Sequence, residues 1–89
     1  MGNAPKLNRE NEELLREVVS KYMADDAERL LQESPDKWLS PLRVRVRDAV
    51  GQELAATGFD ASYAPTARGH MLESIIDFLN RLEFGPKAN

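Results

Sequence analysis

His70 is the one histidine of the chain, and histidine is the side chain best suited to acid–base catalysis or metal binding near neutral pH. On a helix it would lie near Glu73, Ser74 and Asp77, on the side away from the apolar residues. Such neighbours hold a metal only with further ligands, and no nucleophile-elbow motif supports a Ser-His-Asp triad. We therefore interpret His70 as a solvated surface residue.

The other residues of catalytic type do not form a recognisable site. Acidic residues occur as sequence neighbours, such as Glu12 with Glu13 and Asp25 with Asp26, which point about 100° apart on a helix. This spacing suits capping and solubility better than paired acid–base work. The sequence has no cysteine, no glycine-rich phosphate loop and no acidic calcium-binding loop. It predicts a protein that is not an enzyme and has no catalytic residue, metal site or cofactor.

Arginines form the one basic cluster of the sequence, Arg43, Arg45 and Arg47, in which Arg43 and Arg47 share a helical face. Guanidinium groups bind phosphate or carboxylate. Residues 1–36 carry nine acidic side chains against five basic ones. We therefore favour pairing of these arginines with that acidic segment inside the molecule.

The composition is that of one small globular domain, with 89 residues, 42% hydrophobic and 30% charged, and a net charge of −3. Residues 1–36 sum to −4, and residues 37–89, with six acids and seven bases, sum to +1. Neither part is basic enough to indicate a nucleic-acid surface. No apolar run approaches the ~20 residues of a membrane span, and no signal peptide opens the chain. We expect a cytoplasmic protein without a membrane anchor.

The stretch with the clearest start and stop is a helix at residues 41–57. We expect Ser40 to cap it, with Pro41 at the first helical position, and Gly58 to end it in the left-handed conformation. A second stripe of small residues lies opposite the main apolar face: Val44, Gly51 and Ala55. Such a stripe lets another helix approach closely, either from the same chain or from a second copy.

Before this helix, two apolar faces are offset by more than about 100°, too far apart for one straight helix to bury together. We favour two helices, 8–23 and 26–34, over one long helix. Asn8 is expected to cap the first and Asp25 the second, with Glu28 completing a capping box.

Pro35 prevents the second helix from continuing, because it lacks a backbone donor and disfavours helix in the residue before it. The link that follows carries Trp38, the only tryptophan. We expect its ring to cover the end of the core while its N–H binds water or a carbonyl. A ligand-stacking role is the less favoured alternative.

A last helix is predicted at residues 67–83, capped by Thr66 and stopped by Gly85-Pro86. Its apolar residues cover an arc of about 160°: Met71, Leu72, Ile75, Ile76, Phe78, Leu79 and Leu82. Such a wide arc is either deeply packed or partly covered by a partner. Arg68 falls on this arc, and we expect it to pair with a carboxylate, Asp60 in the preceding loop.

These elements predict an all-α fold, a compact bundle of three to four antiparallel helices. Residues 8–84 form the single domain, between flexible termini at 1–7 and 85–89. The expected core residues are Leu15, Val19, Leu30, Leu42, Val46, Val50, Leu54, Leu72, Ile75 and Leu79.

The function we favour is a non-catalytic protein-interaction module, working as a homodimer or as an adaptor or regulator of a larger protein. The wide apolar arc and the two-sided central helix support it, because large apolar faces on a small chain commonly mark an interface. The expected partner-binding residues are Arg43, Arg47, Arg68, Ile76 and Phe78.

The alternative is a helix-turn-helix-like regulator that binds nucleic acid through Arg43, Arg45 and Arg47. Residues 52–59, QELAATGF, are similar to the first helix and turn of that motif. However, Pro65 lies where the recognition helix should run, and acidic side chains on the last helix would repel phosphate. We expect a protein partner and disfavour nucleic acid.

Overall fold

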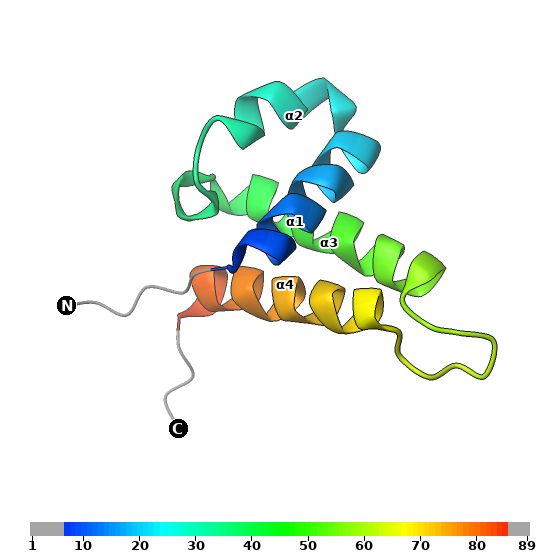
Figure 1. The fold of residues 1–89 in the computed structure, drawn as a ribbon. Helices are drawn as coiled ribbons and strands as arrows, with labels where there is room; N and C mark the ends of the chain where they lie inside the picture. The colour runs from blue at the N-terminus through cyan, green and yellow to red at the C-terminus, as the bar shows by residue number, and fades with distance from the viewer. Residues whose placement is uncertain (1–6, 86–89) are drawn as a thin grey trace.

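A computed structural model describes residues 7–85, which form four α-helices and a short 3-10 turn without a β-strand (Figure 1). This confirms the all-α prediction. The elements are α1 (Arg9–Tyr22), α2 (Ala24–Leu31), η1 (Pro35–Lys37), α3 (Ser40–Thr57) and α4 (Ala67–Phe84). The predictions of flexible termini fall mostly outside the described residues, and Leu7 packs partly buried against the core.

Helices α3 and α4 form an antiparallel hairpin (Figure 1). At one end, which we call the open end, the Ser40 hydroxyl at the start of α3 donates to the Glu83 carboxylate near the end of α4. At the other, the loop end, residues 58–66 connect the helices and the Thr66 amide donates to the Gly58 carbonyl at 2.8 Å. Two helices of a helix-turn-helix would instead meet at roughly 90–120°.

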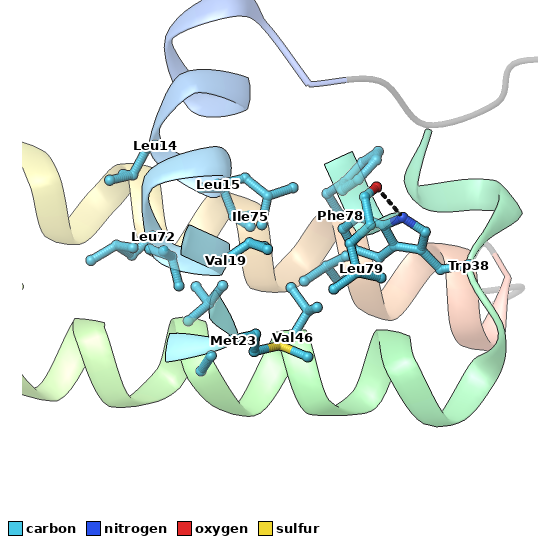
Figure 2. Close-up of a cluster of buried hydrophobic side chains, with 14 residues drawn as sticks. Leu14, Leu15, Val19, Met23, Trp38, Val46, Leu72, Ile75, Phe78 and Leu79 are labelled. Carbon is cyan, nitrogen blue, oxygen red and sulfur yellow. Dashed lines mark hydrogen bonds between the residues drawn. The ribbon is translucent and has the colours of Figure 1, made fainter. Parts of the chain in front are cut away.

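The core lies where α1 packs across this hairpin (Figure 2). The buried apolar residues are Leu14, Leu15, Val18, Val19, Met23, Leu30, Trp38, Val46, Ala49, Val50, Leu72, Ile75, Phe78 and Leu79. Eight of the ten residues expected in the core are among them. The other two, Leu42 and Leu54, are partly buried at its margin.

The chain breaks between α1 and α2 at Met23, which confirms two helices in place of one long helix. The Asn8 side chain caps α1 as predicted, accepting from the Asn11 amide at 2.7 Å. The prediction of Asp25 as the second cap is wrong. Helix α2 begins at Ala24 and has no side-chain cap, because the turn is made by the backbone of Met23, whose N–H still bonds to Val19.

The predicted ends of α3 are also wrong in detail. The helix includes Ser40, whose hydroxyl donates to Glu83. The cap residue is Leu39, whose apolar side chain makes no hydrogen bond. Gly58 is right-handed, with φ −87°, so it does not end α3 as a left-handed residue. It is needed for space: a Cβ there would stand 3.2 Å from Cα of Gly69 and closer still to Leu54.

The wide apolar arc of α4 is mostly internal. Leu72, Ile75 and Leu79 are fully buried under α1 and α3, and Thr66 caps the helix by accepting from the Gly69 amide, as predicted. Gly85, at φ +77°, ends it. Among the described helices, none has the length and apolar character required to cross a lipid bilayer.

Candidate functional site

An apolar groove of about 700 Å³ lies at the open end between α1, the end of α2 and η1. Its apolar floor consists of Leu7, Leu15, Leu31, Pro35, Trp38 and Phe78. Its polar rim consists of Glu12, Arg16, Gln32, Glu33, Ser34 and Asp36. We call this the open-end groove.

Trp38 holds the groove in shape. Its indole N–H donates to the Leu30 carbonyl at 2.9 Å, as the sequence predicts, and its ring is buried beside Phe78 and Leu79 (Figure 2). The bond ties the residue after η1 back to the last turn of α2. Only residues 32–34 separate the end of α2 at Leu31 from Pro35 at the start of η1, so this side of the groove is made by a short, locally constrained segment.

The rim of the groove is acidic. Glu12, Glu33 and Asp36 carry three negative charges against the one positive charge of Arg16. The Ser34 hydroxyl donates to the Asp36 carboxylate at 2.6 Å and lowers the pKa of that carboxyl. The rim therefore presents carboxylate hydrogen-bond acceptors around an apolar floor.

Exposed apolar side chains extend the surface of the open end. Leu39 and Phe84 are 71% and 72% exposed. They directly neighbour Ser40 and Glu83, which are hydrogen-bonded to each other. Two large apolar side chains are thus left in solvent at the end of the molecule that carries the groove.

The loop end carries the other exposed aromatic residues, Phe59 and Tyr63, of which Tyr63 is 86% exposed. Tyr63 has a left-handed backbone, with φ 65°, which non-glycine residues rarely adopt. Asp60 fixes the loop: its carboxylate accepts from the amide and hydroxyl of Ser62 and from the Ala64 amide, at 2.8–3.0 Å. These bonds lower the pKa of the Asp60 carboxyl, so it remains an acceptor at neutral pH.

Glu53 is the most buried charged residue described, at 1% exposure. Its carboxylate accepts hydrogen bonds from Lys21 at 2.8 Å, Tyr22 at 2.9 Å, Arg68 at 2.8 Å and Thr57 at 3.2 Å. These donors come from α1, α3 and α4. The cluster therefore joins all three helices near the loop end.

The bonds from Lys21 and Arg68 lower the pKa of Glu53 to about 2, although burial acts in the opposite direction. The Glu53 carboxylate therefore stays ionised near neutral pH, and its hydrogen bonds hold the three helices together. Sequence reasoning missed Glu53. Its spacing after Val46 and Val50 places it on the buried stripe of α3, and that position was the available signal.

The predicted arginines all have intramolecular partners. Arg43 pairs with Glu83 at 3.1 Å and Arg47 donates to Asn80 at 3.0 Å. Arg45 lies 3.6 Å from Asp26, which is the one ion pair between this cluster and residues 7–36, so the predicted pairing with the acidic first segment holds for Arg45 and not for the carboxylates that Arg43 and Arg47 face.

The prediction that Arg68 pairs with Asp60 is wrong. Arg68 instead contacts Glu17 at 2.6 Å and Glu53 at 2.8 Å. The reason is that the Asp60 carboxylate is directed into its own loop, while the arginine extends across to α1.

The two apolar residues predicted to bind a partner lie in different places. Phe78 is buried, with one edge in the open-end groove. Ile76 is partly buried in a shallow hollow with Gly51 and Ala55, away from the groove. Within residues 7–85, no atom beyond the local helix backbone lies within 4 Å of a Cβ placed on Gly51, so no helix of the described chain packs there.

His70 is an exposed residue, 3.9 Å from Glu73. Among residues 7–85, no group of three or more potential metal ligands was found. A scan against protein-family models, a search of curated proteins and a search of solved structures each gave no match. The open-end groove, with its apolar floor and acidic rim, is the candidate site.

Proposed function

We propose that this domain is a non-catalytic protein-interaction module and that the open-end groove is its docking surface. The observation that supports the proposal is that the open-end groove has an apolar floor and a rim of hydrogen-bond acceptors. Leu15, Leu31 and Trp38 line a hollow that residues 7–85 leave unfilled, and Leu39 and Phe84 widen the apolar surface at the same end. Exposed apolar area of this kind, rimmed by polar groups, is typical of an interaction site.

The rim defines the occupant. The carboxylates of Glu12, Glu33 and Asp36 attract hydrogen-bond donors of a binding partner and repel its acidic groups. The fitting occupant is a protein segment that inserts an apolar side chain into the floor and presents N–H or O–H groups to the rim. An aromatic anchor suits this arrangement, because buried tyrosine and tryptophan residues commonly dominate such contacts.

The frame of the molecule also supports docking. Glu53 fixes α1 to α3 and α4 through Lys21 and Arg68, so the helix that forms one wall of the groove is held on the hairpin. A preformed site loses less conformational entropy on binding. The proposed setting is the cytoplasm, which the cysteine-free composition suits.

Two blocked pentapeptides test this proposal, each with a leucine-tyrosine-leucine centre, one flanked by lysines and one by glutamates. The ¹⁵N-labelled protein is titrated with each peptide while amide shifts and Trp38 fluorescence are recorded. We expect the lysine-flanked peptide to shift residues of α1, α2 and η1 that line the groove, and the glutamate-flanked peptide to bind at least tenfold more weakly.

Two variants serve as matched controls. Leu31→Glu places a charge on the groove floor and should abolish the response, whereas Ile76→Glu, in the separate shallow hollow, should leave it unchanged. Shifts that centre on Ile76 and Gly51, or no shifts with either peptide at millimolar concentration, would contradict the proposal.

A further inference from the structure

We propose that the occupant of the open-end groove is the loop end of a second copy of this chain, anchored by Tyr63, so that copies associate head to tail. This inference rests on the proposed function, since it names the partner of the same groove. It follows from three features of the loop end: its backbone conformation, its rigidity and its position opposite the groove.

The backbone conformation of Tyr63 is the first feature. At φ 65° a glycine or asparagine fits with less strain, and yet the position carries a large aromatic side chain that is 86% exposed. Strained non-glycine residues held by their surroundings concentrate at sites of function. The ring has no packing role within the described chain that would balance this strain, and a contact outside the chain supplies one.

Rigidity is the second feature. The Asp60 amide donates to the Ala64 carbonyl and the Tyr63 amide to the Asp60 carbonyl, both at 2.9 Å, while Phe59 and Pro65 form a bridge at the base of the loop. With the Asp60 carboxylate also bonded within the loop, the tip has a fixed shape. Because the loop is already ordered, it loses little conformational entropy when Tyr63 docks.

The tip matches the groove in its aromatic side chains and its shape, and its one charged residue, Asp60, has its carboxylate directed into the loop, where it accepts three hydrogen bonds. The loop end protrudes and carries aromatic rings, and the open-end groove is concave with an apolar floor. A tyrosine ring placed on Trp38 and Leu31 would bring its phenol O–H, a donor, to the acidic rim. The 700 Å³ hollow has room for the ring and for part of the loop behind it.

Position is the third feature. Figure 1 shows the loop extending beyond α3 and α4 at the end opposite η1. The loop end of one copy therefore cannot reach the groove of the same copy. When one tip occupies one groove head to tail, the other tip and the other groove of the pair stay free, so association continues past the dimer into a larger ring or an open filament.

The contact is small. A buried tyrosine contributes roughly 150–250 Å², and even with Phe59, Leu39 and Phe84 the total is on the order of the lower limit of specific interfaces, about 1,000 Å². We therefore expect association that appears at high micromolar to millimolar concentration.

The test measures solution mass by sedimentation and light scattering of the full chain over that range. The wild type should show an average mass that rises beyond the dimer with concentration. Tyr63→Asn, which removes the ring and suits the backbone, and Leu31→Glu, which blocks the groove, should each be monomeric. An equimolar mixture of the two should form a 1:1 dimer and stop there, since it contains one working tip and one working groove.

Circular dichroism checks that both variants fold. If Leu31→Glu does not fold, Gln32→Trp, which fills the groove from an exposed position, replaces it. Monomers at every wild-type concentration, a closed dimer, or a mixture that stays monomeric would overturn the inference. Association lost in Ile76→Glu but kept in Tyr63→Asn would also overturn it and assign the contact to the shallow hollow.

The peptide titration separates this failure from a failure of the proposed function. If the groove responds to the lysine-flanked peptide while the chain remains monomeric, the groove is a docking surface for another protein and only the self-association is wrong.

Discussion

Gly58 and Gly69 meet through backbone alone where α3 leads into α4. A Cβ added to Gly69 would stand 2.1 Å from the Gly58 carbonyl oxygen, a distance no real contact allows. This close approach lets Thr66 bond to the end of α3 and cap α4 at the same time. The short connection between two antiparallel helices therefore depends on both glycines.

Alanine substitutions at Gly69, which contacts Gly58, and at Gly51, which has no such contact, should change the stability in opposite directions. Gly69→Ala is expected to lower the free energy of unfolding by about 2 kcal/mol, because backbone must move. Gly51→Ala is expected to raise it by up to about 1 kcal/mol, since Gly51 lies inside a helix with open space around it. Urea denaturation measures both. Equal effects of the two substitutions would show that the glycine contact is not what sets the hairpin.

The buried carboxylate of Glu53 gives the second prediction. Glu53→Gln keeps the shape but removes the charge that Lys21 and Arg68 face, so we expect a loss of about 2–3 kcal/mol of unfolding free energy. The control is Glu17→Gln, which breaks only the solvent-exposed bond to Arg68 and should cost less than about 1 kcal/mol. A Glu53→Gln protein as stable as the control would contradict the structural role of the cluster.

Stability should depend on acid in a defined direction. The folded pKa of Glu53 is lowered from 4.5 to about 2, so its contribution is fully present above about pH 4.5 and is lost as the pH falls toward 2. The shift corresponds to about 3 kcal/mol. Urea unfolding at a series of pH values should show the decline, and Glu53→Gln should flatten it. A wild-type profile parallel to that of the variant would count against the pKa of Glu53 as the cause.

The strained backbone at Tyr63 predicts a gain of stability on substitution. Tyr63→Asn should raise the free energy of unfolding by about 1 kcal/mol, because asparagine tolerates the left-handed conformation. Tyr63→Ala keeps the strain and serves as the control, with little change expected. If asparagine and alanine gave the same stability, the backbone conformation of Tyr63 would not be costly, and strain there would not favour a contact outside the chain.

What could be predicted from the sequence depended on local signals. The caps at Asn8 and Thr66 follow from the chemistry of a few neighbouring residues, and the structure has them. The end of the second helix, predicted at residue 34 from Pro35, is wrong by three residues, because α2 already ends at Leu31. The core was also largely predictable, because apolar residues recur at helical spacing on α3 and α4.

The missed features are those that arise between helices. Glu53 is polar by type and is buried only because donors from α1 and α4 converge on it. Arg68 could not be matched to Glu17 without knowing that α1 crosses the hairpin. The open-end groove is likewise assembled from α1, α2, η1 and α4, which no sequence window contains.

The most direct test of the account is a dilution series of the ¹⁵N-labelled wild-type chain, from about millimolar to tens of micromolar, followed by amide chemical shifts. We expect two groups of signals to move together, those of the open-end groove and those of the loop around Tyr63, with the rest of the molecule unchanged. Signals that move only around Gly51 and Ile76, or a spectrum that does not change with concentration and does not respond to the lysine-flanked peptide, would contradict it.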